Sequence, residues 1–198
     1  MKYVLLALFL LISAGCTSYI KTLNEHRETY KEEFLQDPRS PLDSAELHFL
    51  DFYPADAKSR VKASVVLTPE EQPFELPTFS GITKTYRKWG VARFQWDEEH
   101  AQLSLYENIS LLSNPAYKDY LFLPFLDATN GVETYGGGRY INLSKAEAAD
   151  GKLVIDFNTC YNPWCAYSDG YNCPIPPAEN KLAFEVKAGE KMYKVTHH

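Results

Sequence analysis

Histidine is absent from the part of the sequence that is richest in turn-forming and aromatic residues. Of the five histidines in the 198-residue chain, none lies between Leu121 and Asn180. The sequence also lacks an HExxH motif, a nucleophile elbow, a Walker loop and a Rossmann fingerprint. These absences disfavour histidine-dependent catalysis and the common nucleotide-binding sites. We predict neither a metal site nor a cofactor.

Positive charge is also scarce. The 20 Lys and Arg residues are outnumbered by 26 Asp and Glu residues, so the formal net charge is −6. Nucleic-acid binding requires clustered basic side chains that contact phosphates, and no such cluster occurs in the sequence. We therefore expect no nucleic-acid partner. The hydrophobic content of 45% is ordinary for a globular chain, and the length suffices for one domain with a core.

No apolar run reaches the roughly 20 residues of a membrane-spanning helix. The N-terminus instead has the pattern of a secretory signal, with Lys2, an apolar stretch at 4–12 and small residues at 13–15. Small residues followed at once by Cys16 resemble a bacterial lipoprotein signal, in which the cysteine is lipidated. We predict that residues 1–15 are a lipoprotein signal peptide and that Cys16 is the lipidation site. The alternative is a plain secretory signal with an incidental cysteine.

This signal determines the expected location. The mature protein is predicted to be exported and to bind the membrane of the bacterial cell envelope through a lipid at Cys16. In a cell with two membranes, we expect the outer membrane on its periplasmic side.

The chain after Cys16 is predicted to begin with a helix. Residues 16–36 form this lipid-anchored N-terminal helix, because apolar residues recur there at three- and four-residue steps and Pro38 then prevents its continuation. Residues 37–198 are predicted to form a single β-rich domain. The apolar positions of the helix are Ile20, Leu23, Tyr30 and Phe34.

From residue 61 onward, apolar and polar residues alternate as in strands with one solvent-exposed face. Pro124 is expected at a sheet edge or a bulge, because proline cannot donate a ladder hydrogen bond. Short strands at this spacing predict a mainly β (α+β) fold, either an antiparallel β-sandwich or a partly open barrel with the N-terminal helix packed on it. The predicted strands are 61–67, 120–126, 139–143, 152–158, 182–186 and 192–195, with a hairpin of 91–96 and 101–107 connected by 97–100, and a loop at 68–77.

A glycine-rich turn beside an arginine is the best candidate for a ligand site. Gly136, Gly137 and Gly138 allow the backbone to approach a ligand closely, and Arg139 could clamp a carboxylate or phosphate. The alternative is a structural turn in which Arg139 pairs inside the fold with an acidic residue. The candidates for that pairing are Asp127, Glu133 and Asp156. The ligand-binding candidates are Arg139, Tyr135, Asp127, Asn158, Tyr161 and Asn162.

Two polar residues, Asp156 and Asn158, share one face of the predicted strand 152–158. Each would cost about 1–3 kcal/mol if it were buried without a partner. They therefore either bond neighbouring loops or face a ligand. In the second case Asp156 and Glu133 are the candidates for general acid or base catalysis.

Aromatic and cysteine residues follow this strand. The aromatic residues could form a wall that holds a sugar ring, or they could belong to a core. We predict a disulfide between Cys165 and Cys173, because export favours oxidation. Cys160 is then left over as a buried small residue, a nucleophile or a metal ligand. The aromatic residues are Tyr161, Trp164, Tyr167 and Tyr171.

A series of ordered motifs spans most of the chain after the signal and resembles the domain of unknown function 1684 family. The resemblance implies a fold outline and no reaction. Cys160 departs from the family pattern, since a small residue such as alanine would be expected there. The motifs are Ser40-Pro-Leu42, Phe125-Leu-Asp-Ala-Thr-Asn-Gly131, Glu133-Thr-Tyr-Gly-Gly-Gly-Arg-Tyr140, Asp156-Phe-Asn158, Tyr161-Asn-Pro163, Cys165-Ala166, Cys173-Pro-Ile-Pro-Pro177, Asn180 and Ala188-Gly-Glu190.

Two functions of different classes fit these features. The first is a lipid-anchored binding or structural module of the cell envelope, with a loop-built site around Gly136 to Gly138 for a small anionic or sugar-like ligand. The alternative is a carboxylate-dependent hydrolase or lyase that acts on envelope material. In that case Asp156 or Glu133 serves as the base and Arg139 binds the anion. Whether the protein is an enzyme is left open.

Overall fold

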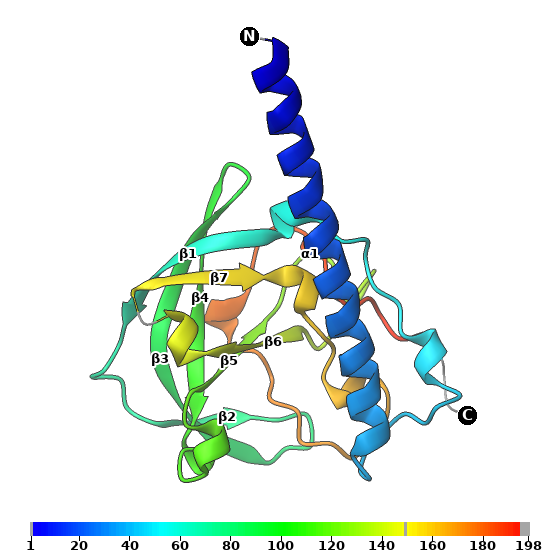
Figure 1. The fold of residues 1–198 in the computed structure, drawn as a ribbon. Coiled ribbons are helices and arrows are strands. Elements are labelled where there is room, and N and C mark those ends of the chain that lie inside the picture. The colour runs from blue at the N-terminus through cyan, green and yellow to red at the C-terminus, as the bar shows by residue number, and fades with distance from the viewer. Residues whose placement is uncertain (1, 149, 195–198) are drawn as a thin grey trace.

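A curved antiparallel sheet forms the body of the protein, and a long N-terminal helix lies against it (Figure 1). The computed structural model describes residues 2–148 and 150–194, with side chains from Ser18 onward. The prediction of a mainly β fold is confirmed, and of its two versions the partly open barrel is the correct one. The sheet is an antiparallel half-barrel, and the described residues contain a single α-helix.

The main path of the sheet runs β6-β5-β4-β3-β1-β7, and β2 pairs with β3 beside this path. β1 and β2 lie along the same side of β3, β1 at residues 90–94 and β2 at residues 83–86. The elements are α1 (Lys2–Gln36), β1 (Arg60–Leu67), β2 (Phe74–Pro77), β3 (Thr83–Trp96), β4 (Glu99–Asn108), β5 (Tyr120–Phe125), β6 (Arg139–Ser144) and β7 (Lys152–Asp156).

The helix prediction is confirmed within the longer helix α1. One side of α1 presents a row of residues to the domain at steps of three or four, so they share one face. Leu23 and Phe34 are only 2% and 3% exposed, which stabilises the contact by about 2 kcal/mol for each side chain. The polar members of the row bond to the domain. This row consists of Tyr19, Leu23, Arg27, Tyr30 and Phe34.

Residues 2–15 are part of the same continuous helix. No helix in the described part of the chain has an apolar stretch long enough to cross a bilayer. Signal-peptide cleavage and lipidation of Cys16 stay predictions, and the side chain of Cys16 lies outside the described side chains.

The two faces of the sheet carry different side chains. Along β4 and β5, Leu105 and Leu121 point into the main aliphatic core, whereas Tyr106 and Phe122 point to the opposite face. This alternation follows from the period of two in a strand. The second face therefore carries a separate aromatic cluster of buried residues. Its members are Leu76, Tyr86, Tyr106, Phe122 and Tyr140.

Pro124 is neither on an edge strand nor in a bulge, because β5 lies between β4 and β6. The ladder between β4 and β5 instead has its one registered pair at Tyr106 and Phe122. Beyond this pair, the side-chain amide of Asn180 fills the gap. It accepts from Ser104 N at 2.7 Å and donates to Ser104 O and Pro124 O at 2.9 and 2.7 Å. A side chain thus replaces the missing strand contacts.

The predicted hairpin is confirmed, but its connection is shorter than expected. Trp96 pairs with Glu99, so only two residues form the turn, and Asp97 adopts a positive φ of 49°. The predicted loop 68–77 is wrong over its last four residues, which form β2 against the start of β3. The register of β2 was hidden because exposed polar and proline residues surround its one buried residue, Leu76.

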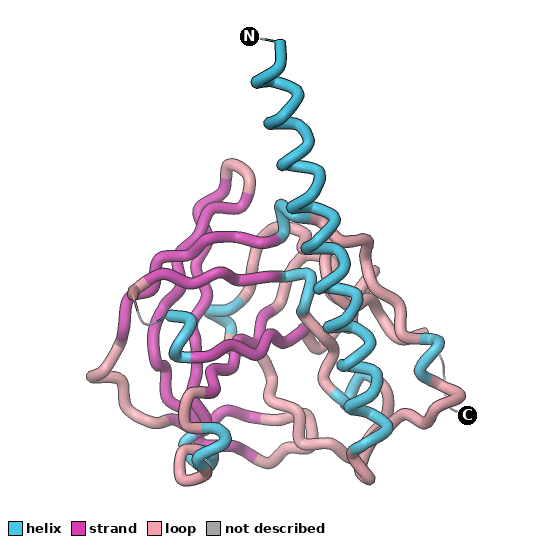
Figure 2. Tube along the Cα trace, in the orientation of Figure 1, coloured by secondary structure: helices cyan, strands magenta, loops and turns pink. Residues whose placement is uncertain are grey.

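The predicted strands at 182–186 and 192–195 are not formed between Leu182 and Lys194, and residue 195 lies outside the described residues. The alternation at Leu182 and Val186 does bury both side chains. Their backbone, however, bonds to the loop after β5 and to the side chain of Arg139 instead of a neighbouring strand. Figure 2 shows that the chain after β7 runs in loops and short helical turns.

Candidate functional site

Arg139 has no exposed surface and is bonded inside the protein. Its guanidinium contacts Asp127 Oδ2 at 2.8 Å and donates to the carbonyl oxygens of Val186, Ala188 and Glu190 at 2.8, 2.5 and 3.2 Å. Of the two interpretations drawn from the sequence, the structure shows the internal pairing with Asp127. These contacts hold the C-terminal segment against the sheet.

The glycine-rich turn is also packed. Gly138 has a φ of +88°, and a Cβ there would lie 2.6 Å from Phe125 O and 2.7 Å from Pro176 Cγ. Only glycine fits this close approach. The residue before the three glycines, Tyr135, donates from its hydroxyl to Cys165 O at 3.3 Å. The turn thus lies against the neighbouring loops.

The two predicted carboxylates have partners in the protein. Asp156 accepts from the Tyr19 hydroxyl at 2.8 Å and from the Asn158 side chain at 2.9 Å. The structure therefore brings Asp156 and Asn158 together beside the middle of α1. Glu133 lies apart, near the surface. Hydrogen bonds from Lys187 and then Tyr53 hold the pKa of Glu133 below its usual value. The strand prediction was wrong past Asp156, because 157–159 form a 3-10 turn.

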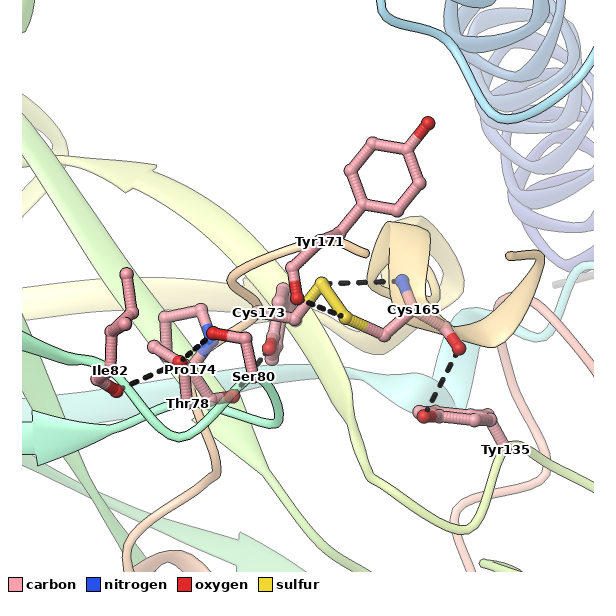
Figure 3. The surroundings of a disulfide bond; sticks show 9 residues. Thr78, Ser80, Ile82, Tyr135, Cys165, Tyr171, Cys173 and Pro174 are labelled. Carbon is pink, nitrogen blue, oxygen red and sulfur yellow. Dashed lines mark hydrogen bonds between the residues drawn. A yellow bond between two sulfur atoms is a disulfide. The ribbon is translucent and has the colours of Figure 1, made fainter. Parts of the chain in front are cut away.

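Cys165 and Cys173 lie at disulfide distance, with Cα atoms 6.2 Å apart, and Figure 3 shows the ring of Tyr171 directed away from this pair. The segment that follows bonds to the end of β2, through Ile175 N to Pro77 O at 2.9 Å. The cysteines therefore fix a loop beside the sheet. Cys160 is a free, buried cysteine, and burial raises its pKa to about 11.

An open cleft of about 790 Å³ lies between the aromatic face of the sheet and this disulfide loop. Tyr86, Phe122 and Tyr140 are the most buried rings along it. Other rings along the cleft are partly exposed. These part-exposed rings come from β5 and from the segment around the disulfide. The part-exposed rings are Tyr120, Tyr161, Trp164 and Tyr171.

Polar groups are placed among these rings. The hydroxyls of Tyr120 and Tyr161 both donate to Asn142 Oδ1, at 2.8 and 2.7 Å, which orients the two rings. Asn108 also lines the cleft. Tyr167, which the sequence grouped with the wall, is instead buried in a second core cluster. Of the six ligand-binding candidates, Tyr161 is the one found among the described residues that line the cleft.

The charged side chains along the cleft differ in their partners and in their exposure to solvent. Arg39 lies 5.9 Å over the Trp164 ring and pairs with Asp37 at 2.8 Å. Asp169 is exposed on the disulfide loop. Lys84, on β3, is part-buried, and loss of solvation lowers its pKa. Sequence reasoning missed Lys84, since a lysine on an alternating strand reads as a solvent-exposed residue.

The family comparison covers the domain that builds the cleft. The profile of the protein family of unknown function DUF1684 matches residues 45–191. The chain belongs to the DUF1684 family. Its fold is similar to the solution NMR structure of an uncharacterized protein from Haloarcula marismortui, with 30% sequence identity and a TM-score of 0.70. The match covers 90% of this chain and 96% of that one. No curated protein matches the chain significantly.

This DUF1684 chain has a further buried acid that the site prediction did not include. Glu190 is fully buried, and its carboxylate accepts from Tyr167 OH at 2.6 Å, Asn162 N at 2.9 Å and Tyr30 OH at 3.0 Å. Burial raises the pKa of Glu190 to about 7. Asn162, a predicted ligand residue, is thus part of an internal network. In the sequence, the family motif Ala188-Gly-Glu190 was the signal that pointed to Glu190.

The described residues contain no group of three or more His, Cys, Asp or Glu side chains arranged for a metal ion. Neither Asp156 nor Glu133 is among the described residues that line the aromatic cleft. The carboxylates and the cleft are therefore separate features of the fold.

Proposed function

We propose that the protein is a lipid-anchored binding module of the cell envelope and that the aromatic cleft is its ligand site. The single observation that carries the site is the cleft itself, in which part-exposed aromatic rings stand beside amide and hydroxyl groups. Ligand sites combine apolar and aromatic walls with a few oriented polar groups. We place the site here, and not at Arg139, because the arginine has no exposed surface.

The ligand that fits such walls is sugar-like. A sugar ring has an apolar C–H face that packs on an aromatic ring, and hydroxyl groups around its edge that need hydrogen-bond partners. Trp164 and Tyr171 offer ring surface, with centroids 5.2 Å apart. Asn108 offers an amide group along the cleft, and Asn142 holds the hydroxyls of Tyr120 and Tyr161 in place. The open shape of the cleft suits an oligosaccharide that extends beyond it.

Variants that lack an aromatic ring of the cleft should bind oligosaccharides at least tenfold more weakly than the wild type. We would titrate the unlipidated mature chain with β-1,4-linked hexasaccharides, neutral and acidic, by calorimetry and by tryptophan fluorescence, to which Trp164 on the cleft contributes. Tyr120→Ala and Tyr171→Ala remove part-exposed ring surface and are expected to raise Kd, because stacking is lost. Phe49→Ala is the control, since Phe49 is 46% exposed and does not line the cleft. A protein that binds no hexasaccharide, or binds equally after both cleft substitutions, would refute the proposal.

The anchor rests on the N-terminal pattern of Lys2, the apolar stretch 4–12 and the small residues before Cys16. Mass spectrometry of the protein from membranes should find a mature N-terminus at Cys16 that carries a diacylglyceryl group. Cys16→Ser should abolish this modification and release the protein from the membrane fraction. An unmodified Cys16 in the membrane-isolated protein would disprove the anchor while leaving the cleft proposal intact.

A further inference from the structure

Lys84 is a part-buried cation whose charge no carboxylate neutralises within the described residues. It lines the aromatic cleft, and the one cause that lowers its pKa is desolvation. No hydrogen bond or ion pair of its amine occurs in the described part of the protein. Burying a charge is costly unless it is paired. The Lys84 ammonium is therefore available to pair with an anionic ligand in the cleft.

Other part-buried lysines of the same sheet are compensated. Lys88, also on β3, contacts Glu179 at 2.9 Å, and Lys145, in the 3-10 turn directly after β6, contacts Glu107 at 2.8 Å. The charged side chains along the cleft do not supply this compensation for Lys84. Arg39 is a second cation, and Asp169 is exposed to solvent.

We propose that the cleft binds an acidic saccharide, whose carboxylate pairs with the Lys84 ammonium while its rings pack against the aromatic walls. This inference rests on the proposed function and specifies the ligand class. A uronic acid ring combines the two required features, an apolar face and a carboxylate on the same ring. A fatty acid supplies the carboxylate but offers no hydroxyl groups to the Asn108 amide and the tyrosine hydroxyls along the cleft.

The position of Lys84 explains how the protein would recognise the carboxylate of the saccharide. Lys84 lies two residues before Tyr86 on β3, so the two side chains share the aromatic face of the sheet. The low-dielectric rings around the amine strengthen its attraction to an anion relative to water. A charge-assisted hydrogen bond of this kind contributes roughly 1.5–3 kcal/mol, which corresponds to at least about a tenfold difference in Kd.

The test compares two hexasaccharides that differ only at C6. β-1,4-linked mannuronate hexamer carries a carboxylate there, and β-1,4-linked mannohexaose carries a hydroxymethyl group. At low salt the wild-type domain should bind the mannuronate hexamer at least tenfold more tightly, and added salt should reduce this preference. Lys84→Gln should remove the preference, and Lys84→Arg should keep it. Lys152→Gln is the charge-matched control, because Lys152 is exposed on β7.

The outcomes separate this inference from the proposed function. Equal binding of both hexamers, unchanged by Lys84→Gln but weakened by Tyr120→Ala, would overturn the role of Lys84 and retain the saccharide site. Binding of neither hexamer by the wild-type domain would overturn both. Melting curves of each variant show whether the fold is intact, and Lys84→Arg covers the case in which Lys84→Gln does not fold.

Discussion

Replacing Arg139 with methionine is expected to lower the free energy of unfolding by about 4 kcal/mol. The substitution leaves the Asp127 carboxylate buried without its cation, and breaking a buried pair from one side costs about 3–5 kcal/mol. It also removes the donors to three carbonyl groups of the C-terminal segment. For a domain of this size the melting temperature should fall by about 10 °C. Urea and thermal unfolding followed by circular dichroism measure both quantities.

Two further variants make this prediction specific. Arg93→Met removes an exposed arginine from β3 and should change the melting temperature by less than about 2 °C. Arg139→Met combined with Asp127→Asn should be more stable than Arg139→Met alone, because no lone buried charge remains. If Arg139→Met unfolds at the wild-type urea concentration, Arg139 does not hold the C-terminal segment in place.

Stability is expected to decrease between pH 5 and pH 8 because of Glu190. The pKa of its carboxyl is about 7 in the folded protein, mainly through burial, and 4.5 is its ordinary value. The folded state thus binds more protons than the unfolded state in this interval. The contribution is fully present below pH 4.5 and is lost as the pH rises through 7. This shift corresponds to about 3 kcal/mol.

Glu190→Gln isolates this contribution. Glutamine is neutral at every pH. Its amide oxygen can replace Oε2, which accepts from Asn162 N and Tyr30 OH, and its NH2 group can donate to the Tyr167 hydroxyl in place of Oε1. The pKa values of Tyr30, on α1, and of Tyr167 are raised above 10, so both phenols stay neutral across the interval. Urea unfolding at pH 5 and pH 8 should show a smaller loss in the variant than in the wild type. Glu185→Gln, on the exposed surface, serves as control. Identical pH profiles for wild type and Glu190→Gln would contradict the assignment.

Local sequence patterns predicted the parts of the fold that depend on local chemistry. The apolar steps at Leu23 and Phe34 determine the helix face, and Pro38 determines where the helix ends. The alternation in 61–67 determines β1 and its buried side chains. Cys165 and Cys173, which were predicted to pair, lie at disulfide distance and only eight positions apart. In each case the residues that decide the structure are near neighbours in the chain.

The remaining features depend on contacts between distant segments. Buried residues alternate along 182–186 whether or not the segment pairs with a neighbouring strand. Here its backbone bonds to the loop after β5 and to the side chain of Arg139. The sequence pointed to a site at Arg139 because burial of an arginine is not visible from composition. The cleft brings Lys84 together with Tyr171, from two segments 87 positions apart, so no local motif marks it.

The length of α1 sets the distance between the predicted lipid site at Cys16 and the cleft. The 21 residues from Cys16 to Gln36 span about 30 Å at 1.5 Å per step, and Arg39 follows at the edge of the cleft. Figure 1 shows the N-terminal half of α1 projecting from the sheet while the other half lies along it. Signal cleavage before Cys16 would remove most of the projecting half. The helix that remains is packed on the domain from Tyr19 onward, so with a lipid at Cys16 it would be a rigid spacer along the domain. It would hold the cleft away from the headgroups, where long polymers of the aqueous compartment can enter it.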